Sequence, residues 1–132
     1  MRNSILCKIE HLHATEEEAV IISFGNKELA ETYTLLSAFY SNKLDKVVFN
    51  DSNNAHTVLL VHSSNSSKKE VPLMQIDEES HLLNNKWFEA VYNLLIDVFL
   101  NGWHQGAHVD FAFAEGKKEF QLCIAVNPPH ED

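Results

Sequence analysis

The sequence is poor in glycine, proline, cysteine and basic residues. Its 132 residues include four glycines, three prolines and two cysteines. A glycine-rich phosphate-binding loop is hard to build from so few glycines, and neither G-x-x-x-x-G-K-[ST] nor G-x-G-x-x-G occurs. The cysteines, Cys7 and Cys123, lie in separate apolar stretches and form no C-x-x-C pair. They are therefore predicted to be buried, reduced thiols packed as small hydrophobic side chains.

Basic residues are outnumbered by acidic ones. The chain has 10 Lys and Arg against 19 Asp and Glu, which gives a net charge of -9 with its eight histidines neutral. Both halves of the sequence are acidic, so the charge is not confined to one tail. A negative field repels nucleic-acid phosphates and anionic lipids and attracts basic proteins. Nucleic-acid and membrane partners are therefore not expected.

Long hydrophobic runs are also missing. The longest strongly apolar stretch, Val91–Leu100, contains Asn93 and Asp97. A membrane span needs about 20 apolar residues, which this stretch does not reach. The N-terminal residues show no apolar segment with a cleavage site, so no secretory signal is predicted. A cytoplasmic location is the expectation.

The length and pattern predict one domain over residues 1–126, followed by a frayed tail over residues 127–132. Alternating apolar residues predict strands, and apolar residues recurring every three or four positions predict helices. The expected strands are Ser4–Leu12, Glu18–Phe24, Lys46–Phe49, His56–His62, Glu70–Ile76, Ala107–Ala114 and Glu119–Val126. The expected helices are Lys27–Ser41, capped by Asn26, and one within Glu78–Asn101, ended by Gly102.

One segment gives conflicting signals. Thr15 and Glu18 fit a helix capping box, whereas the β-branched residues up to Phe24 favour a strand. We predict a turn over residues 14–17 and a strand after it, with one long helix as the alternative. Pro72 indicates an edge position or a strand start. The resulting order β-β-α-β-β-β-α-β-β predicts an α+β fold, in which both helices pack on one face of a mixed or mainly antiparallel sheet.

Histidines are the first candidates for a site. His11 and His13 would point to the same side of a strand and could share a metal ion. The sequence does not identify a third ligand, with Glu10, Glu16 and other elements all open. Two solvent-facing histidines are therefore the favoured interpretation, and no metal or cofactor is predicted. His104 and His108 are four residues apart, but the neighbouring glycines argue against a helix that would pair them.

No catalytic pattern is present. The chain has no G-x-S-x-G elbow, and neither cysteine has a local activating group. The run Asp77-Glu78-Glu79 is interpreted as favourable charge at a helix start. An enzyme is therefore not predicted. A small histidine-based metal-binding protein or enzyme is the alternative function.

The preferred prediction is a small acidic inhibitor that binds a basic protein. An immunity protein that neutralises a bacterial toxin or nuclease is the favoured member of this class, by analogy of charge and size, because complementary charge steers such association. Trp103, in the loop over residues 102–108, is a candidate anchor or a residue folded back onto the core. The predicted partner-binding residues are Glu16, Glu17, Glu18, Asp45, Asp51, Asp77, Glu78, Glu79 and Trp103.

Overall fold

A computed structural model describes residues 3–14, 16–64, 70–83, 85–115 and 118–127. Its strands and helices follow the order β1 (Ser4–His13), β2 (Glu17–Phe24), the 3-10 turn η1 (Asn26–Glu28), α1 (Leu29–Tyr40), β3 (Lys46–Asp51), β4 (Thr57–Ser64), β5 (Glu70–Ile76), β6 (Glu79–Leu82), α2 (Asn85–Asn101), β7 (His108–Glu115) and β8 (Lys118–Val126). The α+β prediction is confirmed, with one more strand than expected.

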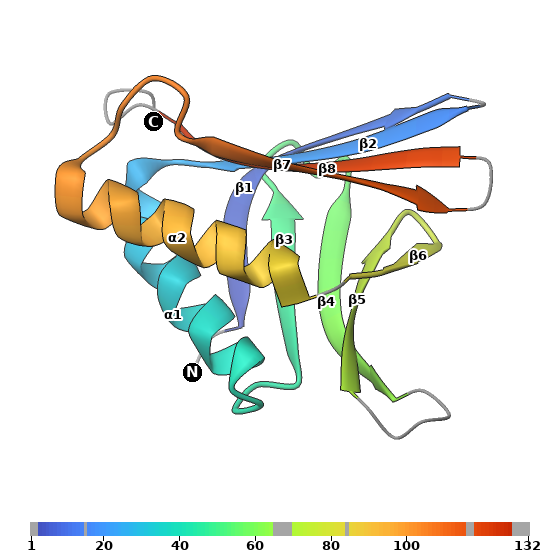
Figure 1. Ribbon diagram of the computed structural model, residues 1–132, viewed down its shortest axis with the longest axis horizontal. Coiled ribbons are helices and arrows are strands. Elements are labelled where there is room, and N and C mark those ends of the chain that lie inside the picture. Colours follow the sequence, from blue (N-terminus) through green and yellow to red (C-terminus); the bar gives the residue numbers. More distant parts are fainter. Residues whose placement is uncertain (1–2, 15, 65–69, 84, 116–117, 128–132) are drawn as a thin grey trace.

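All eight strands belong to one curled sheet in the order β6-β5-β4-β3-β1-β2-β8-β7. The sheet is mixed, because β1 runs parallel to β3 and β2 runs parallel to β8, while the other neighbours are antiparallel. β1 joins the two arms: its residues 4–7 pair with β3, and its residues 8–13 pair with β2. Figure 1 shows the arms diverging from β1, with α1 and α2 between them.

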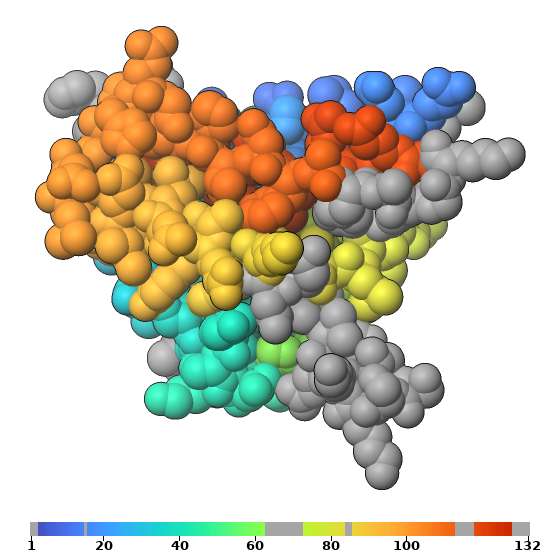
Figure 2. Space-filling view, in the orientation of Figure 1, coloured from blue at the N-terminus to red at the C-terminus, as the bar shows by residue number. Residues whose placement is uncertain are grey.

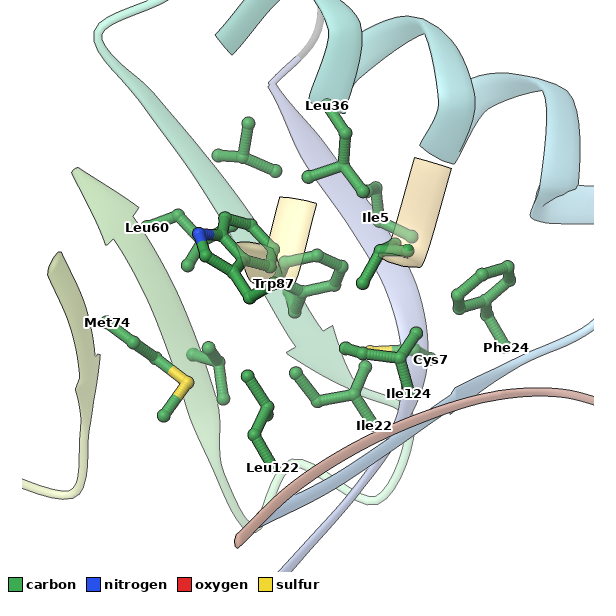
Figure 3. Packing of buried hydrophobic residues seen from close by; sticks show 14 of the residues in the cluster. Ile5, Cys7, Ile22, Phe24, Leu36, Leu60, Met74, Trp87, Leu122 and Ile124 are labelled. Atoms are coloured by element: carbon green, nitrogen blue, oxygen red, sulfur yellow. The ribbon is translucent and has the colours of Figure 1, made fainter. Parts of the chain in front are cut away.

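The hydrophobic core fills the hollow of this curl. Ile5, Cys7 and Ile9 alternate on the inner face of β1, and the matching alternation continues on β2 and β8. The predicted apolar stripe of α2 is buried, and its Trp87 points into the same cluster as Leu36 of α1 (Figure 3). The helices pack against each other, and β7 packs against α2 on the face shown in Figure 2, with β8 on the far side of β7. Burying each large side chain contributes about 1.5–3 kcal/mol.

The ambiguous segment before Phe24 is a strand, so the long-helix alternative is wrong. β2 pairs along its whole length with β8, from Glu17 opposite Glu119 to Phe24 opposite Val126. On its other side it pairs with β1. Two flanking strands satisfy the backbone of β2, which outweighs the capping signal. Pro72 lies in β5 opposite His62 of β4, just before the stretch of β5 that pairs with β6.

The interpretation of Asp77-Glu78-Glu79 as a helix start is wrong. Asp77 and Glu78 have φ angles of 47° and 71°, and they form the two-residue turn of a hairpin between β5 and β6. Positive φ at both positions is the geometry of a type I′ turn, whose right-handed twist suits a hairpin. Glu79 begins β6, and α2 begins only at Asn85.

The ends of the two helices agree in part with expectation. α1 follows a 3-10 turn, and the predicted Asn26 cap is wrong because neither η1 nor α1 has a side-chain cap hydrogen bond. Gly102 ends α2 with a φ of 80°, as predicted, and its N–H donates to Val98 O at 2.9 Å. Asn127 N–H donates to Phe24 O at 2.9 Å, and the rest of the predicted tail lies outside the described residues. None of the described helices has the length and apolar character to span a membrane.

Candidate functional site

The inner face of the sheet changes from apolar to polar at one end. On β1 the stripe of Ile5, Cys7 and Ile9 continues as His11 and His13. On β2 the inner stripe begins with Glu18, which lies opposite His13 across the strand pair. Because side chains alternate along a strand, the spacing that buries the core residues turns these polar groups inward as well.

The β5–β6 hairpin supplies the other wall of this polar region. Its turn carries Asp77, and β6 adds Glu79 and His81. His56, just before β4, lies beside the same turn, and Lys118 reaches in from the start of β8. We call this group the histidine–carboxylate cluster; its members are His11, His13, Glu18, His56, Asp77, Glu79, His81 and Lys118.

His11 lies at the centre of the cluster, with a side chain only 5% exposed. Its Nδ1 is 2.6 Å from Asp77 Oδ2, and its Nε2 is 2.5 Å from Glu18 Oε2. A ring that donates from both nitrogens is an imidazolium. Burial opposes that charge, but hydrogen bonds to Asp77 and Glu18 outweigh it and raise the pKa of His11. The expectation that His11 faces solvent is wrong.

Glu18 is the most buried carboxylate of the cluster, at 2% exposure. Burial alone would raise its pKa, but hydrogen bonds with Glu79, His11 and Lys118, together with the charge of His81, lower the pKa to about 2. A bond between Glu18 and Glu79 requires a proton on one of them. When both are ionised, the buried Oε2 of Glu79 has no hydrogen-bond donor among the described residues. Lys118 and His11 lie beside the pair and provide positive charge there.

Further imidazoles converge on the same two carboxylates. His81 Nε2 lies 3.5 Å from Glu18 Oε2 and 3.7 Å from Glu79 Oε2, and its ring stacks on Phe120 with the centroids 4.0 Å apart. His13 Nε2 lies 2.8 Å from Glu79 Oε1. Lys118 Nζ lies 3.1 Å from Glu18 Oε1 and supplies one permanent positive charge.

Asp77 connects the cluster to the β3–β4 turn. Its Oδ2 accepts from His11 and also from His56 Nδ1 at 2.8 Å. The bond to His11 is the largest cause of the lowered pKa of Asp77, and the nearby charge of His56 adds to it. Asp77 thus links side chains from three separate loops and strands.

Six of the predicted partner-binding residues lie at this end of the molecule. Glu16 and Glu17 are exposed at the tip of the β1–β2 hairpin, and Asp77 and Glu78 are exposed in the β5–β6 turn. Contacts of His11 with Asp77 and of His13 with Glu79 hold the two tips side by side. We call the four exposed carboxylates the acidic patch: Glu16, Glu17, Asp77 and Glu78. The other two, Glu18 and Glu79, belong to the cluster beneath it.

The remaining predicted residues lie elsewhere. Asp45 is exposed in the loop before β3, at the opposite end of that strand from the cluster. Asp51 is 3% exposed and accepts backbone N–H groups of Asn53 and Ala55 at 3.1 and 3.2 Å. These backbone hydrogen bonds lower the pKa of Asp51, with the largest contribution from Asn53, and they shape the turn after β3.

Trp103 is folded back onto the domain, which is the alternative that the sequence left open. Its indole Nε1–H donates to Val126 O at 2.8 Å, and its ring packs against the core. In the same loop, His104 donates to Asp97 at 2.6 Å. This bond raises the pKa of His104.

Sequence reasoning missed His56, His81 and Lys118. His81 falls in a segment that was assigned to a helix start, although Glu79, His81 and Leu83 alternate as in a strand. His56 is the first residue of a predicted strand and Lys118 directly precedes another, and nothing in the local pattern places them beside His11. Only the curl of the sheet brings these residues together.

Neither cysteine has the character of a nucleophile. Burial is the main cause that raises the pKa of Cys7 and that of Cys123 to about 12. Thiols with such high pKa values carry almost no thiolate near neutral pH. Comparison of the chain with protein-family models, curated protein sequences and solved structures gave no match.

Proposed function

We propose that this protein binds and neutralises a basic protein partner through the acidic patch. One observation supports the proposal: two hairpin tips more than sixty residues apart in sequence are held together by His11–Asp77 and His13–Glu79 contacts. Four carboxylates are thereby exposed at one end of a chain whose net charge is -9.

The physical effect of this arrangement is electrostatic steering. Clustered surface charge speeds the encounter with an oppositely charged partner, and the effect weakens as salt screens it. The carboxylates of the patch stand on two tight hairpins, so little conformational entropy is lost when they meet lysine or arginine side chains. A toxin or nuclease domain with a basic active-site surface has the required chemistry.

The test is a charge reversal with a matched control. The triple variant Glu16→Lys, Glu17→Lys, Glu78→Lys reverses three of the four charges of the patch and leaves Asp77, with every cluster contact, in place. The control, Glu31→Lys, Asp45→Lys, Glu89→Lys, changes the net charge equally at exposed positions elsewhere. The partner assayed is the protein encoded next to this chain's gene, co-expressed with it and purified with it.

At low salt the patch variant is expected to bind that partner at least about tenfold more weakly, with most of the loss in the association rate. The control variant is expected to bind like the wild type. Equal weakening by both variants would reduce the effect to net charge and overturn the assignment of the surface. A neighbouring protein that is not basic, or that forms no complex, would overturn the proposal itself.

A further inference from the structure

The buried part of the cluster has the composition and spacing of a metal site. Zinc is bound by imidazole nitrogens and carboxylate oxygens at about 2.0–2.2 Å, which in a tetrahedron separates the ligand atoms by about 3.3–3.6 Å. His81 Nε2 lies 3.5 and 3.7 Å from Oε2 of Glu18 and of Glu79, and His11 Nε2 lies 3.9 Å from Glu79 Oε2. Ligand atoms of His11, Glu18 and Glu79 all lie within 4.8 Å of one another.

The hydrogen bond between His11 Nε2 and Glu18 Oε2, at 2.5 Å, is too short for two ligands of a shared ion. A metal ion replaces the proton of that bond, so the two atoms must separate by about 1 Å to reach the tetrahedral spacing.

Asp77 gives His11 the outer partner that metal-binding histidines need. Its Oδ2 accepts from His11 Nδ1 at 2.6 Å, which leaves Nε2 as the nitrogen that faces Glu18 and Glu79. In metal sites a carboxylate on the second ring nitrogen fixes the tautomer and orients the ring. His56, which also donates to Asp77, holds that carboxylate from the other side.

Charge also favours a cation at this place. Glu18 and Glu79 bring two carboxylates together, and Lys118 and the ring of His11 lie beside them. The buried Oε2 of Glu79 has no hydrogen-bond donor among the described residues. A divalent cation would take the place of the proton on His11 Nε2 and bind that oxygen of Glu79 directly. Two imidazole ligands select zinc or a neighbouring transition metal over magnesium or calcium, which prefer oxygen.

We propose that His11, His81, Glu18 and Glu79 bind one divalent transition metal ion, with zinc as the probe. The ligands come from β1, β2 and β6, so the ion would connect the β1–β2 hairpin to the β5–β6 hairpin across the open side of the curled sheet. This inference does not depend on the proposed partner, because the ligands lie beneath the acidic patch.

The test uses the full chain without a histidine tag. Zinc content is measured by mass spectrometry after dialysis against a low zinc concentration, and affinity is measured by competition with a chelating dye. We expect one ion per chain and a melting temperature that rises with zinc, because a ligand of the native state stabilises it. Glu79→Gln and His81→Ala are each expected to lower the affinity at least tenfold, while near-UV circular dichroism shows that both still fold.

His104→Ala is the matched control, because His104 is a histidine paired with a carboxylate outside the cluster. It is expected to leave stoichiometry and affinity unchanged. His56→Ala tests the competing set of His11, His56 and Asp77, whose ligand atoms are also close together. A greater loss of affinity in His56→Ala than in His81→Ala would overturn the assigned ligands. Zinc binding that Glu79→Gln and His81→Ala both leave intact would overturn the site.

Discussion

The buried carboxylate of Glu18 gives a prediction about acid stability. Its pKa is lowered to about 2 in the folded protein, against an ordinary value of 4.5. A carboxylate whose pKa is lower in the folded state stabilises the protein above its unfolded pKa, and this contribution is lost as the pH falls towards the folded pKa. The wild type should therefore lose stability between about pH 5 and pH 2 because of this group.

The size of the effect follows from the same pKa values. The interval from 4.5 to about 2 sets an upper bound of about 3 kcal/mol on the contribution of Glu18. The groups that stabilise its charge include Lys118, which is 29% exposed and so partly screened by solvent. We therefore expect about 1–2 kcal/mol in practice.

The assay is denaturant unfolding over this pH range with EDTA present, comparing the wild type with Glu18→Gln. The variant carries no titrating group at this position, so it should be less stable than the wild type at neutral pH. The two should converge at low pH. Glu31→Gln, at an exposed position on α1, should follow the wild-type profile throughout. A constant difference between the wild type and Glu18→Gln at every pH would refute the reasoning.

Three other predictions concern His11, the core and the cysteines. Because hydrogen bonds raise the pKa of His11, its charged form stabilises the protein below the unfolded pKa of 6.5, and this contribution is lost as the pH rises through the folded pKa. His11→Gln should therefore weaken the fall in unfolding free energy that the wild type shows as the pH rises above 6.5. An unchanged pH dependence would contradict a raised pKa at His11. Leu95→Ala removes a side chain that is 1% exposed and should cost about 2–5 kcal/mol in denaturant unfolding, whereas Leu100→Ala, 78% exposed, should change stability by less than about 0.5 kcal/mol. Cys7 and Cys123 should react slowly with a disulfide reagent in the native protein and quickly once it is unfolded, and fast labelling of the native protein would contradict their raised pKa values.

The alternation of apolar residues was sufficient to predict most of the sheet. Ile5, Cys7 and Ile9 indicated the inner face of β1, and the buried stripe of α2 came from its helical spacing. The strand β6 was missed because its turn, Asp77-Glu78, lacks the glycine or asparagine that usually marks positive φ. The run Asp77-Glu78-Glu79 was interpreted as favourable charge at the start of a helix for the same reason.

The site was less predictable than the fold, since it depends on contacts between distant segments. The same-side spacing of His11 and His13 was recognised, but their partners Asp77 and Glu79 are each 66 residues away. Those partners meet the histidines only because the sheet curls at β1, where one strand changes neighbours from β3 to β2. Local pattern carries no information about that curvature.

The energetics of the histidine–carboxylate cluster bear on why charged side chains occupy this end of the sheet. Well-packed apolar side chains often match or exceed the stability of a buried set of charges. On β1 and β2 the inner positions beside His11 and Glu18 are filled by Ile9 and Val20, so the fold accommodates apolar residues there. Stability alone therefore does not call for imidazoles and carboxylates at this end of the sheet. The proposed cation beneath the surface and the proposed basic partner above it would both make use of the negative charge that these side chains gather.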